Sequence, residues 1–455
     1  MKIKLKQFIL LTGDIFFLYL SLYLTLCLRY RQKPDFELWQ GHFAPFTIAF
    51  ALWLLFFYIL NLYSLRFASN NSRFYKNSLK GMGLGAIFAL AYFYLAPNMA
   101  IAPKTNLLIF IAVFTTLFLL WRNFFNWIIG SRLPKKNIAI IGFDSSAQEM
   151  VEEIKNKPHL GLNISFIFDD ENKISESTLR NIPIIKNLTE IKTAVIKSNV
   201  DLLILSLDPR QSTELNKILF SILTLKVNFT SLPNFYEEVI GKVPVSAINQ
   251  SWFLENLNEA DKKSFDLLKK LFDFGFAFFA LAISAIFWPF IAILIKLESR
   301  GPIFIRMERC GQNGQPFKMY KFRSMREENN TRTPTIANDP RITKFGKFLR
   351  NTRLDEIPQL INILRGEMSF VGPRPERPEI AVELEKEIPF YRERELVKPG
   401  VTGWDQISGE YHSPSPADTL KKMQYDLFYI KNRSLYLDFS IILKTIATVF
   451  SRAGR

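Results

Sequence analysis

The sequence predicts a membrane protein that combines an all-α membrane part with an α/β part. We expect four N-terminal transmembrane helices at 1–133, a Rossmann-like middle domain at 134–257, a re-entrant membrane helix at 258–297 and a mostly helical C-terminal domain at 298–455. Three observations predict this order. Four long apolar runs fill the first third, strand-like and helix-like segments alternate in the middle, and a fifth apolar run with a proline inside it precedes a basic block.

Composition favours a membrane protein over a nucleic-acid binder, and no nucleic-acid partner is expected. The 455 residues carry a formal net charge of +16, and 48% of them are hydrophobic. Long apolar blocks alternate with basic ones, and the length suggests more than one domain. Cys27 and Cys310 lie too far apart for a disulfide framework or a zinc site, and the three histidines are scattered. Any metal would therefore be a hard cation held by carboxylates and phosphates.

The four apolar runs, at about 8–28, 43–63, 82–98 and 105–129, are each close to the roughly 20 residues that a spanning helix needs. The first is not a cleaved signal peptide, because it carries Asp14 and leads to Arg29 instead of a small-residue cleavage site. Its flanks and those of the other runs place eleven basic residues on one side and four on the other, which predicts that both ends of this unit are cytoplasmic. The larger set is Lys2, Lys4, Lys6, Arg66, Arg73, Lys76, Lys80, Arg122, Arg132, Lys135 and Lys136, and the smaller is Arg29, Arg31, Lys33 and Lys104.

The middle of the chain reads as βα units. Strand-like "NIAIIGF", "NISFIFDD", "DLLILSL" and "VNFTSL" are separated by helix-like segments such as "SSAQEMVEEIKN", which predicts a parallel sheet of the Rossmann type. A dinucleotide fingerprint needs a series of glycines after the first strand. Only Gly142 is present there, and Asp144, Ser145 and Ala147 follow it. A packing or regulatory role is therefore favoured over nucleotide binding.

The fifth apolar run begins after Lys269-Lys270 and contains Pro289, which removes a backbone hydrogen bond and bends a helix. Basic residues flank both of its ends, so the charge rule places both in the cytoplasm. A helix–break–helix that enters one leaflet and returns satisfies both facts. The alternative is an ordinary spanning helix with a kink.

Basic residues then recur among aromatic ones. "RCGQNGQPFKMYKFRSM" holds Lys321 and Arg323, and "DPRITKFGKFLRNTRLDE" repeats a cation every three residues with Ile342, Phe345 and Phe348 between. On a helix this pattern gives a basic stripe beside an apolar stripe, which suits a membrane surface of anionic lipid. A solvated basic face is the alternative. The repeated cations are Arg341, Lys344, Lys347 and Arg350.

Two further features suggest phosphate chemistry. In "GPRPE", two prolines hold Arg374 forward, which suits bidentate phosphate contact, although a simple surface turn is the alternative. Asp355 and Glu356 stand among arginines, and their local alternative is a helix cap. An ionised carboxylate is a nucleophile toward phosphorus. Repulsion from a phosphate at about 4 Å costs roughly 4 kcal/mol at an effective dielectric near 20. Arginines would offset part of this cost, and a Mg²⁺ bridging a protein carboxylate and a diphosphate would offset more, so Asp355 and Glu356 are the candidate metal ligands.

Residues 261–455 resemble the bacterial sugar transferases, which are monotopic phosphoglycosyl transferases acting on polyprenyl phosphate. The resemblance is carried by "GPIFIRMERCGQNGQPFKMYKFRSM", "DPRITKFGKFLR", "LDEIPQLINILRGEMSFVGPRPE", "KPGVTGWDQISG" and "YDLFYIKNRSLYLDFSIILKT" in this order. With the helices and the Rossmann-like domain, the chain is similar to the long members of the family, which start exopolysaccharide or O-antigen repeat units.

The resemblance implies a catalytic domain at 298–455 and a reaction. Asp355 would attack the sugar-linked phosphate of a UDP-sugar and release UMP, and polyprenyl phosphate would then take the phosphosugar from the aspartate. Glu356 would help to hold Mg²⁺. It also implies the bacterial cytoplasmic (inner) membrane and its lipids, with the catalytic domain facing the cytoplasm, and leaves a homodimer open. We assign substrate binding to Lys321, Arg323, Arg341, Arg350, Arg353, Pro373, Arg374, Pro375 and Glu376.

The sequence departs from the family's motifs at two places, and two other functions are alternatives to sugar phosphate transfer. Arg353 stands where the family often has Ser or Thr, and Lys269-Lys270 stands where it often has Lys-Arg. A membrane-anchored nucleotide-sugar dehydratase or epimerase would need a glycine-rich loop and a Tyr-x-x-x-Lys pair, but Tyr236 is followed by Ile240. An inactive scaffold of a polysaccharide assembly complex would not need the acidic pair. The sequence leaves open which sugar is transferred and in which pathway.

Overall fold

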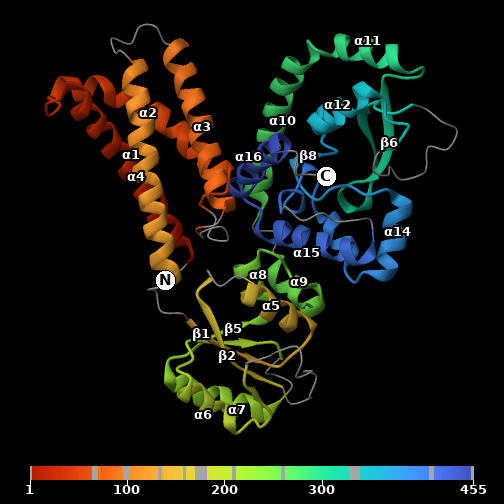
Figure 1. The fold of residues 1–455 in the computed structure, drawn as a ribbon. Helices are drawn as coiled ribbons and strands as arrows, with labels where there is room; N and C mark the ends of the chain where they lie inside the picture. The colour runs from red at the N-terminus through yellow and green to blue at the C-terminus, as the bar shows by residue number, and fades with distance from the viewer. Residues whose placement is uncertain are drawn as a thin grey trace. The chain divides into compact units, whose positions relative to one another are not determined.

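The computed structural model describes residues 3–63, 70, 72–95, 103–131, 136–156, 160–169, 182–207, 212–257, 262–326, 339–408 and 415–451. The chain folds into two compact units, Met1–Leu232 and Pro233–Arg455. Figure 1 shows the elements of both units in chain order.

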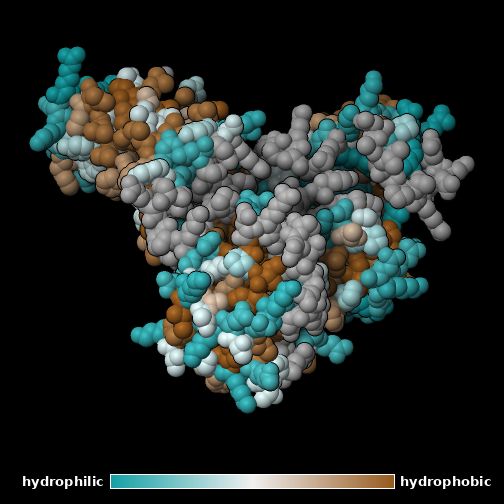
Figure 2. Space-filling model, turned by 60° about the horizontal axis from the view of Figure 1, so that its bottom comes forward, coloured by the Kyte–Doolittle hydropathy of each residue, from teal (hydrophilic) through white to brown (hydrophobic). Residues whose placement is uncertain are grey.

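The first unit begins with the four predicted membrane helices: α1 (Ile3–Tyr30), α2 (Phe36–Ile59), α3 (Ser72–Leu95) and α4 (Pro103–Ser131). All four are long and apolar enough to cross a membrane. Their shared core is built largely from phenylalanine, including Phe46, Phe57, Phe110 and Phe114. Hydrophobic residues also cover much of the outer surface of this bundle, at the upper left of Figure 2, as expected for helices whose solvent is lipid.

One basic residue of the predicted flanks lies inside the bundle instead. Arg122 is part of α4, is 2% exposed and forms an ion pair of 2.6 Å with Asp14 of α1. It also donates to the carbonyl of Leu62 at 2.9 Å. Arg122 therefore neutralises a buried carboxylate and is wrongly counted among the loop charges. Of the other predicted flank residues, Lys2, Arg66, Arg132 and Lys135 lie outside the described part of the chain.

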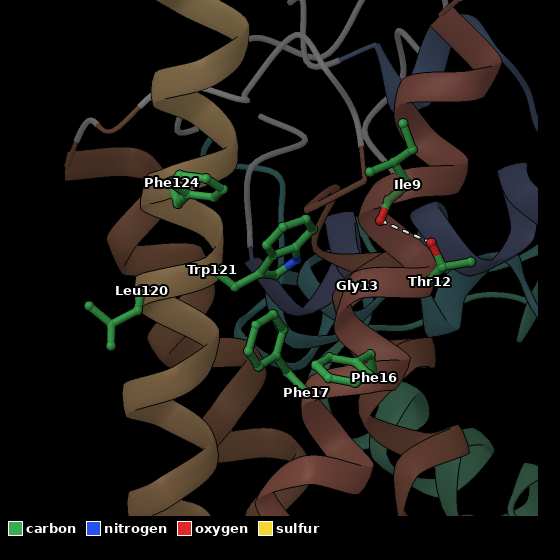
Figure 3. Close-up of a pocket in the computed structure, with 8 residues that line it drawn as sticks. All are labelled: Ile9, Thr12, Gly13, Phe16, Phe17, Leu120, Trp121 and Phe124. Carbon is green, nitrogen blue, oxygen red and sulfur yellow. Dashed lines mark hydrogen bonds between the residues drawn. The ribbon is translucent and has the colours of Figure 1, made fainter.

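Helices α1 and α4 approach closely because α1 carries a glycine at the contact. A Cβ at Gly13 would lie 2.2 Å from the ring of Trp121, and Figure 3 shows this indole reaching from α4 toward Gly13. An apolar groove of about 620 Å³ runs beside the contact. Its lining is Ile9, Thr12, Gly13, Phe16, Phe17, Leu120, Trp121 and Phe124.

The middle of the chain forms a five-stranded parallel sheet in the order β3-β2-β1-β4-β5. The strands are β1 (Lys136–Ile141), β2 (Leu162–Phe168), β3 (Ile184–Ile185), β4 (Leu202–Leu205) and β5 (Asn228–Ser231), and the helices are α5 (Ser145–Asn156), α6 (Glu190–Lys197) and α7 (Thr213–Ile222). Helices α6 and α7 cover one face of the sheet and α5 the other (Figure 1). The four predicted strands are confirmed, and the two-residue β3 is an addition.

The turn after β1 contains one glycine and a capping aspartate in place of a glycine series. Gly142 has φ +89, and a Cβ there would lie 2.3 Å from the side chain of Leu207. Asp144 accepts hydrogen bonds from the amide of Ala147 at 2.7 Å, in the first turn of α5, and from the hydroxyl of Ser206 at 2.8 Å. The protein's own carboxylate thus lies at the helix N-terminus, which is where dinucleotide-binding domains place a phosphate.

The second unit is mostly helical, as predicted, and also contains two small sheets. Its helices are α8 (Leu232–Ile240), α9 (Gln250–Asn256), α10 (Lys263–Ala285), α11 (Trp288–Glu298), α12 (Lys344–Thr352), α13 (Gln359–Leu364), α14 (Pro378–Glu387), α15 (Pro416–Asn432) and α16 (Leu435–Ser451). Strands β6 (Phe304–Cys310) and β7 (Pro316–Phe322) form an antiparallel hairpin, and β8 (Ser369–Val371) pairs in parallel with β9 (Gly400–Thr402). Val243, Val245 and Trp252 pack against the hydrophobic residues of α14 and α15, which groups 233–257 with this unit.

The fifth apolar run is broken where the proline predicts. Helices α10 and α11 meet at 60° across Ile286 and Phe287, and Pro289 lies in the first turn of α11. Proline is tolerated at this position because the first amides of a helix have no intrahelical acceptor. The Ser284 hydroxyl donates to the carbonyl of Leu281 at 3.1 Å, and the amide of Phe287 donates to the carbonyl of Ser284 at 2.9 Å.

Polar contacts tie the first half of α10 to the rest of its unit. Lys262, just before the helix, donates to two carbonyls at the end of α15, at 2.7 and 3.0 Å. Asp266 pairs with Arg433 at 3.1 Å, and Lys269 pairs with Asp438 of α16 at 2.5 Å. One face of α10 up to Lys269 is therefore ionic, whereas the described residues beyond Asp273 are almost entirely apolar.

The far end of α11 returns to the same unit. Both carboxylate oxygens of Glu298 accept from the amide of Phe345, at 3.0 and 2.9 Å, in the first turn of α12. Trp288 lies against Phe304 and Phe322 of the β6–β7 hairpin, with ring centroids 5.4 and 5.5 Å apart. The bent pair thus begins and ends on one folded body.

Candidate active site

The acidic pair lies in a tight turn between two helices. Helix α12 starts at the cap Thr343, whose hydroxyl accepts from the amide of Gly346 at 2.9 Å, and ends at Arg353, which has φ 55 in the left-handed region. A single 3₁₀ turn, η8 (Leu354–Glu356), then carries both acids. The interpretation of the acids as the cap of the following helix is wrong, since α13 begins only at Gln359 with Pro358 as its cap.

A glycine sets the position of α12. A Cβ at Gly346 would lie 2.0 Å from the backbone oxygen of Ser324, so only glycine permits this approach. Leu349 is fully buried and packs with Phe322 and Ile295. The helix that precedes the acids is therefore held directly against the end of β7.

Strand β7 presents Lys321 to the acids. Phe317, Met319 and Lys321 lie on one face of the strand because side chains alternate with a period of two. The first two are buried against Leu360 and Ile363 of α13. Lys321, at the end of this face, reaches the turn that precedes α13.

Glu356 is surrounded by cations. It is 8% exposed, and its Oε1 accepts from Lys321 at 2.7 Å and from Arg374 at 3.3 Å. The Arg353 guanidinium is 3.7 Å from Oε2. Burial disfavours the ionised form, but the attraction of Lys321, Arg374 and Arg353 outweighs it and lowers the pKa of Glu356 to about 2. Glu356 is therefore ionised at neutral pH and anchors these cations.

Asp355 differs from its neighbour although it is equally buried. Among the described residues, its carboxylate accepts no hydrogen bond, whereas that of Glu356 accepts two. Burial raises the pKa of Asp355, the Glu356 charge adds to the rise, and Lys321, Arg350 and Arg374 oppose it. Two adjacent carboxylates with different environments can take different chemical roles, and the oxygens of Asp355 are the ones left available.

The structure divides the other predicted site residues into two groups. Lys321, Arg353 and Arg374 surround Glu356, and Arg350 acts on Asp355 while donating to Ser324 at 2.9 Å. Two more are engaged within the fold. Arg323 is buried and donates to the carbonyl of Ser299 at 2.7 Å, and Arg341 forms a two-armed ion pair with Asp339, at 2.9 and 2.6 Å.

The predicted basic stripe is shorter than the repeat indicates. Arg341 precedes the cap Thr343 and so lies outside α12, which is a correction to its expected place on the helix. Lys344, Lys347 and Phe348 are exposed on α12 itself. One and a half turns of helix therefore present two cations beside an aromatic ring.

The loop Pro373–Pro375 leaves strand β8 at a site of close backbone contact. A Cβ at Gly372 would lie 2.3 Å from the carbonyl oxygen of Lys398, and one at Gly400 would lie 2.1 Å from the amide of Gly372. The motifs "FVGPRPE" and "KPGVTGW" are thus in backbone contact, and Glu376 contributes its carbonyl to the amide of Cys310 at 2.9 Å. This packing brings Arg374 to the acidic turn.

Sequence reasoning missed two residues that support this arrangement. Asn362 is fully buried, donates to the carbonyl of Lys318 at 2.8 Å and accepts from the amide of Tyr320 at 3.1 Å, so it fixes α13 to β7. Its signal was a side-chain amide three residues after Gln359 in an otherwise apolar run. Arg394 is 6% exposed and donates to the carbonyl of Arg374 at 3.0 Å. Nothing in the sequence marked Arg394, because it lies in a run of alternating acidic and basic residues that is typical of a solvated surface.

Comparison with known proteins identifies the family. The bacterial sugar transferase family matches residues 264–452, and a CoA-binding domain family matches residues 58–233. The UDP-glucose:undecaprenyl-phosphate glucose-1-phosphate transferase of Xanthomonas campestris pv. campestris is 31% identical over 351 residues, which cover 73% of this chain and 70% of the relative. The chain belongs to the bacterial sugar transferase family.

Other members of the bacterial sugar transferase family match over different lengths. The UDP-glucose:undecaprenyl-phosphate glucose-1-phosphate transferase of Escherichia coli is 32% identical over 70% of this chain and 69% of its own. The UDP-N-acetylgalactosamine-undecaprenyl-phosphate N-acetylgalactosaminephosphotransferase of Aeromonas hydrophila is 43% identical over 36% of this chain and 39% of its own. The chain is therefore a phosphoglycosyl transferase, an enzyme.

The sugar transferase site has too few protein ligands for a metal cage. Among the described residues, no group of three His, Cys, Asp or Glu side chains could hold an ion. Mg²⁺ keeps several waters and is often bound by one or two carboxylates together with substrate phosphates. Among the described residues, the oxygens of Asp355 and the Oε2 of Glu356 accept no hydrogen bond, and this Oε2 lies 3.7 Å from Arg353. The donor set thus fits Mg²⁺ only as an ion that shares its ligands with a diphosphate.

The first prediction concerns the stability of this sugar transferase against acid. The ordinary pKa of Glu356 is 4.5 and the folded value is about 2, so its ionised form contributes roughly 3 kcal/mol above pH 4.5 that is lost as pH falls toward 2. Lys321→Met removes the nearest cation. We expect it to lower the unfolding midpoint at pH 7, with a difference from the wild type that narrows below pH 4.5.

The matched control is Lys318→Met, which makes the same chemical change at an exposed position of the same strand. Thermal unfolding in detergent, from pH 7 to pH 3, gives the unfolding midpoints of the wild type, Lys321→Met and Lys318→Met. A Lys321→Met curve parallel to the wild-type curve would contradict the assigned ion pair.

Proposed function

We propose that this enzyme transfers a sugar 1-phosphate from a UDP-sugar to polyprenyl phosphate and releases UMP. The relatives support the reaction, since their names give a UDP-sugar and undecaprenyl phosphate as substrates. They name glucose in two cases and N-acetylgalactosamine in a third, so the sugar is left open. A polyprenyl diphosphate sugar of this kind would start a polysaccharide or glycoconjugate.

The reaction proceeds through a covalent intermediate on Asp355. One of its carboxylate oxygens attacks the phosphorus that carries the sugar, the bond from this phosphorus to the UMP oxygen breaks and UMP leaves, and an aspartyl acyl phosphate that carries the sugar forms. The phosphate oxygen of the lipid then attacks the same phosphorus and frees Asp355. The observation that carries this assignment is the contrast within the pair: Asp355 accepts no hydrogen bond among the described residues, and Glu356 is held by Lys321 and Arg374.

The cations of the site serve the substrate phosphates. Arg374 is nearly half exposed, at 47% of its side-chain surface, so its guanidinium can contact a phosphate while it remains next to Glu356. Lys321 and Arg350 add positive charge around Asp355 and reduce the repulsion between its carboxylate and the diphosphate. Asp355 and Glu356 would hold Mg²⁺, which when bound would neutralise the charge that develops on the leaving phosphate.

The bent pair α10–α11 is proposed to enter one leaflet and return. Ion pairs hold α10 up to Lys269 on the folded unit, and the amide of Phe370 donates to Asp273 at 3.4 Å. Only residues 274–285 then remain before the break, about 18 Å of helix against a hydrocarbon core of roughly 30 Å. Since α11 returns to α12, the catalytic unit would stay on the cytoplasmic side of the inner membrane, where UDP-sugars are made.

Replacing the nucleophile is the central test. Asp355→Asn keeps the size of the side chain and removes its negative charge, so UMP release from UDP-sugars should fall at least a thousandfold, about 4 kcal/mol in activation free energy, with an unchanged unfolding midpoint. Glu383→Gln, an exposed acid of α14, is the control and should retain full activity. After incubation without lipid, mass spectrometry should find one phosphosugar on the peptide that contains Asp355. Wild-type turnover by Asp355→Asn would refute the assignment.

The metal is tested separately. We expect a chelator in excess to abolish UMP release and added Mg²⁺ to restore it. Glu356→Gln should lower the rate and weaken the dependence on Mg²⁺, because a neutral amide is a poor ligand for a hard cation. Undiminished activity of the wild type in excess chelator would remove the metal from the proposal.

Cysteine labelling tests the topology. In a protein with Cys27 and Cys310 replaced by Ser, single cysteines at Glu255 and Gln315, both exposed, lie on either side of the bent pair. We expect both to be protected from an impermeant maleimide in intact cells and labelled after permeabilisation. Lys33→Cys, between α1 and α2, should be labelled in intact cells and is the control. Labelling at position 315 but not at 255 would show that the pair spans the membrane.

A further inference from the structure

The loop Pro373–Pro375 is held mainly through its carbonyl groups. Its two prolines have no N–H to donate. The carbonyl of Pro373 accepts from the amide of Gly400 at 2.9 Å, and that of Arg374 accepts from the side chain of Arg394 at 3.0 Å. The first of these bonds is fixed by the backbone of β9. The second depends on one side chain, so the position of Arg374 can be altered without moving a strand.

Arg394 is itself held in one orientation. It comes from the 3₁₀ segment η9 (Tyr391–Leu396) and is buried. Its Nη1 donates to the hydroxyl of Tyr391 at 2.8 Å, and its Nε and Nη2 lie 3.1 and 2.8 Å from one carboxylate oxygen of Asp426 on α15. Nη2 also donates to the carbonyl of Arg374. A planar guanidinium with three partners in different directions cannot rotate without losing one of them.

Stability alone does not account for this buried pair. Taking an arginine and an aspartate out of water costs several kcal/mol per ion, and well-packed apolar side chains of similar volume often serve as well. What an apolar side chain could not supply is a donor aimed at the carbonyl of Arg374. The side chain of the same residue points to the acidic turn, where the Arg374 guanidinium lies 3.3 Å from Oε1 of Glu356.

We propose that Arg394 is a positioning residue for the transfer reaction and acts through Arg374. By fixing the carbonyl of Arg374, it fixes the backbone position from which the Arg374 side chain extends. The guanidinium then reaches both Glu356 and the nucleotide phosphate. The inference rests on the proposed function of the site. It assigns Arg394 no contact with the substrate, which distinguishes it from Arg374.

A double-mutant cycle tests the coupling. Arg394→Lys keeps the positive charge beside Asp426, but one ammonium cannot reproduce the three directions of the guanidinium fork. We expect kcat/KM for the UDP-sugar to fall at least tenfold when Arg394→Lys is made in the wild type. In the Arg374→Ala background the same change should cost less than twofold, because the group being positioned is gone.

Two variants control the experiment. Arg392→Lys makes the same chemical change in the same 3₁₀ segment, at an exposed arginine that pairs with Glu385 of α14 at 2.6 Å, and should stay within twofold of wild-type activity. Tyr391→Phe removes one acceptor of Arg394 without changing charge. It should give a smaller loss than Arg394→Lys, also suppressed by Arg374→Ala, and it replaces Arg394→Lys in the cycle if that variant does not fold.

The outcomes separate this inference from the proposed function. An equal loss from Arg394→Lys in both backgrounds would show a general structural role, and wild-type kcat/KM in that variant would show no role; either overturns the inference. Calorimetric titration of UMP into the wild type, Arg394→Lys, Arg374→Ala and the double variant measures the same cycle without turnover. We expect the loss of UMP affinity caused by Arg394→Lys to be at least tenfold larger in the wild type than in the Arg374→Ala background. If the wild type binds UMP with this coupling but releases none from UDP-sugars, the proposed function fails and the positioning role stands.

Discussion

The ion pair between Lys321 and Glu356 is the interaction on which the site depends. Two adjacent carboxylates in a buried turn repel each other, and at least one needs a close cation to stay ionised. The nearest cation comes from β7, a second from the loop at 373–375 and a third from Arg353 at the turn itself. Two segments distant in sequence from the acidic turn therefore converge with it on one carboxylate. Because Glu356 takes these contacts, Asp355 is left with available oxygens.

These segments can meet at Glu356 only because their backbones approach more closely than side chains normally allow. Glycines permit it at two places: Gly346 lies on the carbonyl of Ser324, and Gly372 lies against Gly400. The left-handed Arg353 completes the arrangement, since it ends α12 abruptly and lets the acids occupy a separate turn. The linked motifs of the sequence thus have a geometric meaning, because each carries a residue that another motif touches.

The sequence predicted what depends on local pattern and composition. Four membrane helices, the strands β1, β2, β4 and β5 and the break at Pro289 all follow from apolar periodicity or from proline. Arg341 was misplaced because a three-residue repeat of cations looks helical until a cap interrupts it. Arg394 and Asp426 were missed because their bond joins residues 32 positions apart, which no local pattern encodes. Arg122 was taken for a loop charge because its partner Asp14 lies in another helix, 108 positions away.

Strand β7 links the bent helix pair α10–α11 to the acids. One face of it, with Phe317 and Met319, packs on Ala277 of α10 and on α13, and the other face, through Phe322, meets Trp288 and Ile295 of α11. Ile357, the residue after Glu356, belongs to both of these clusters. A change in the angle between α10 and α11 would therefore shift β7, its Lys321 and the acidic turn together. On the proposed topology, the bend that keeps the helices in one leaflet is also what holds the nucleophile at the depth of a lipid phosphate.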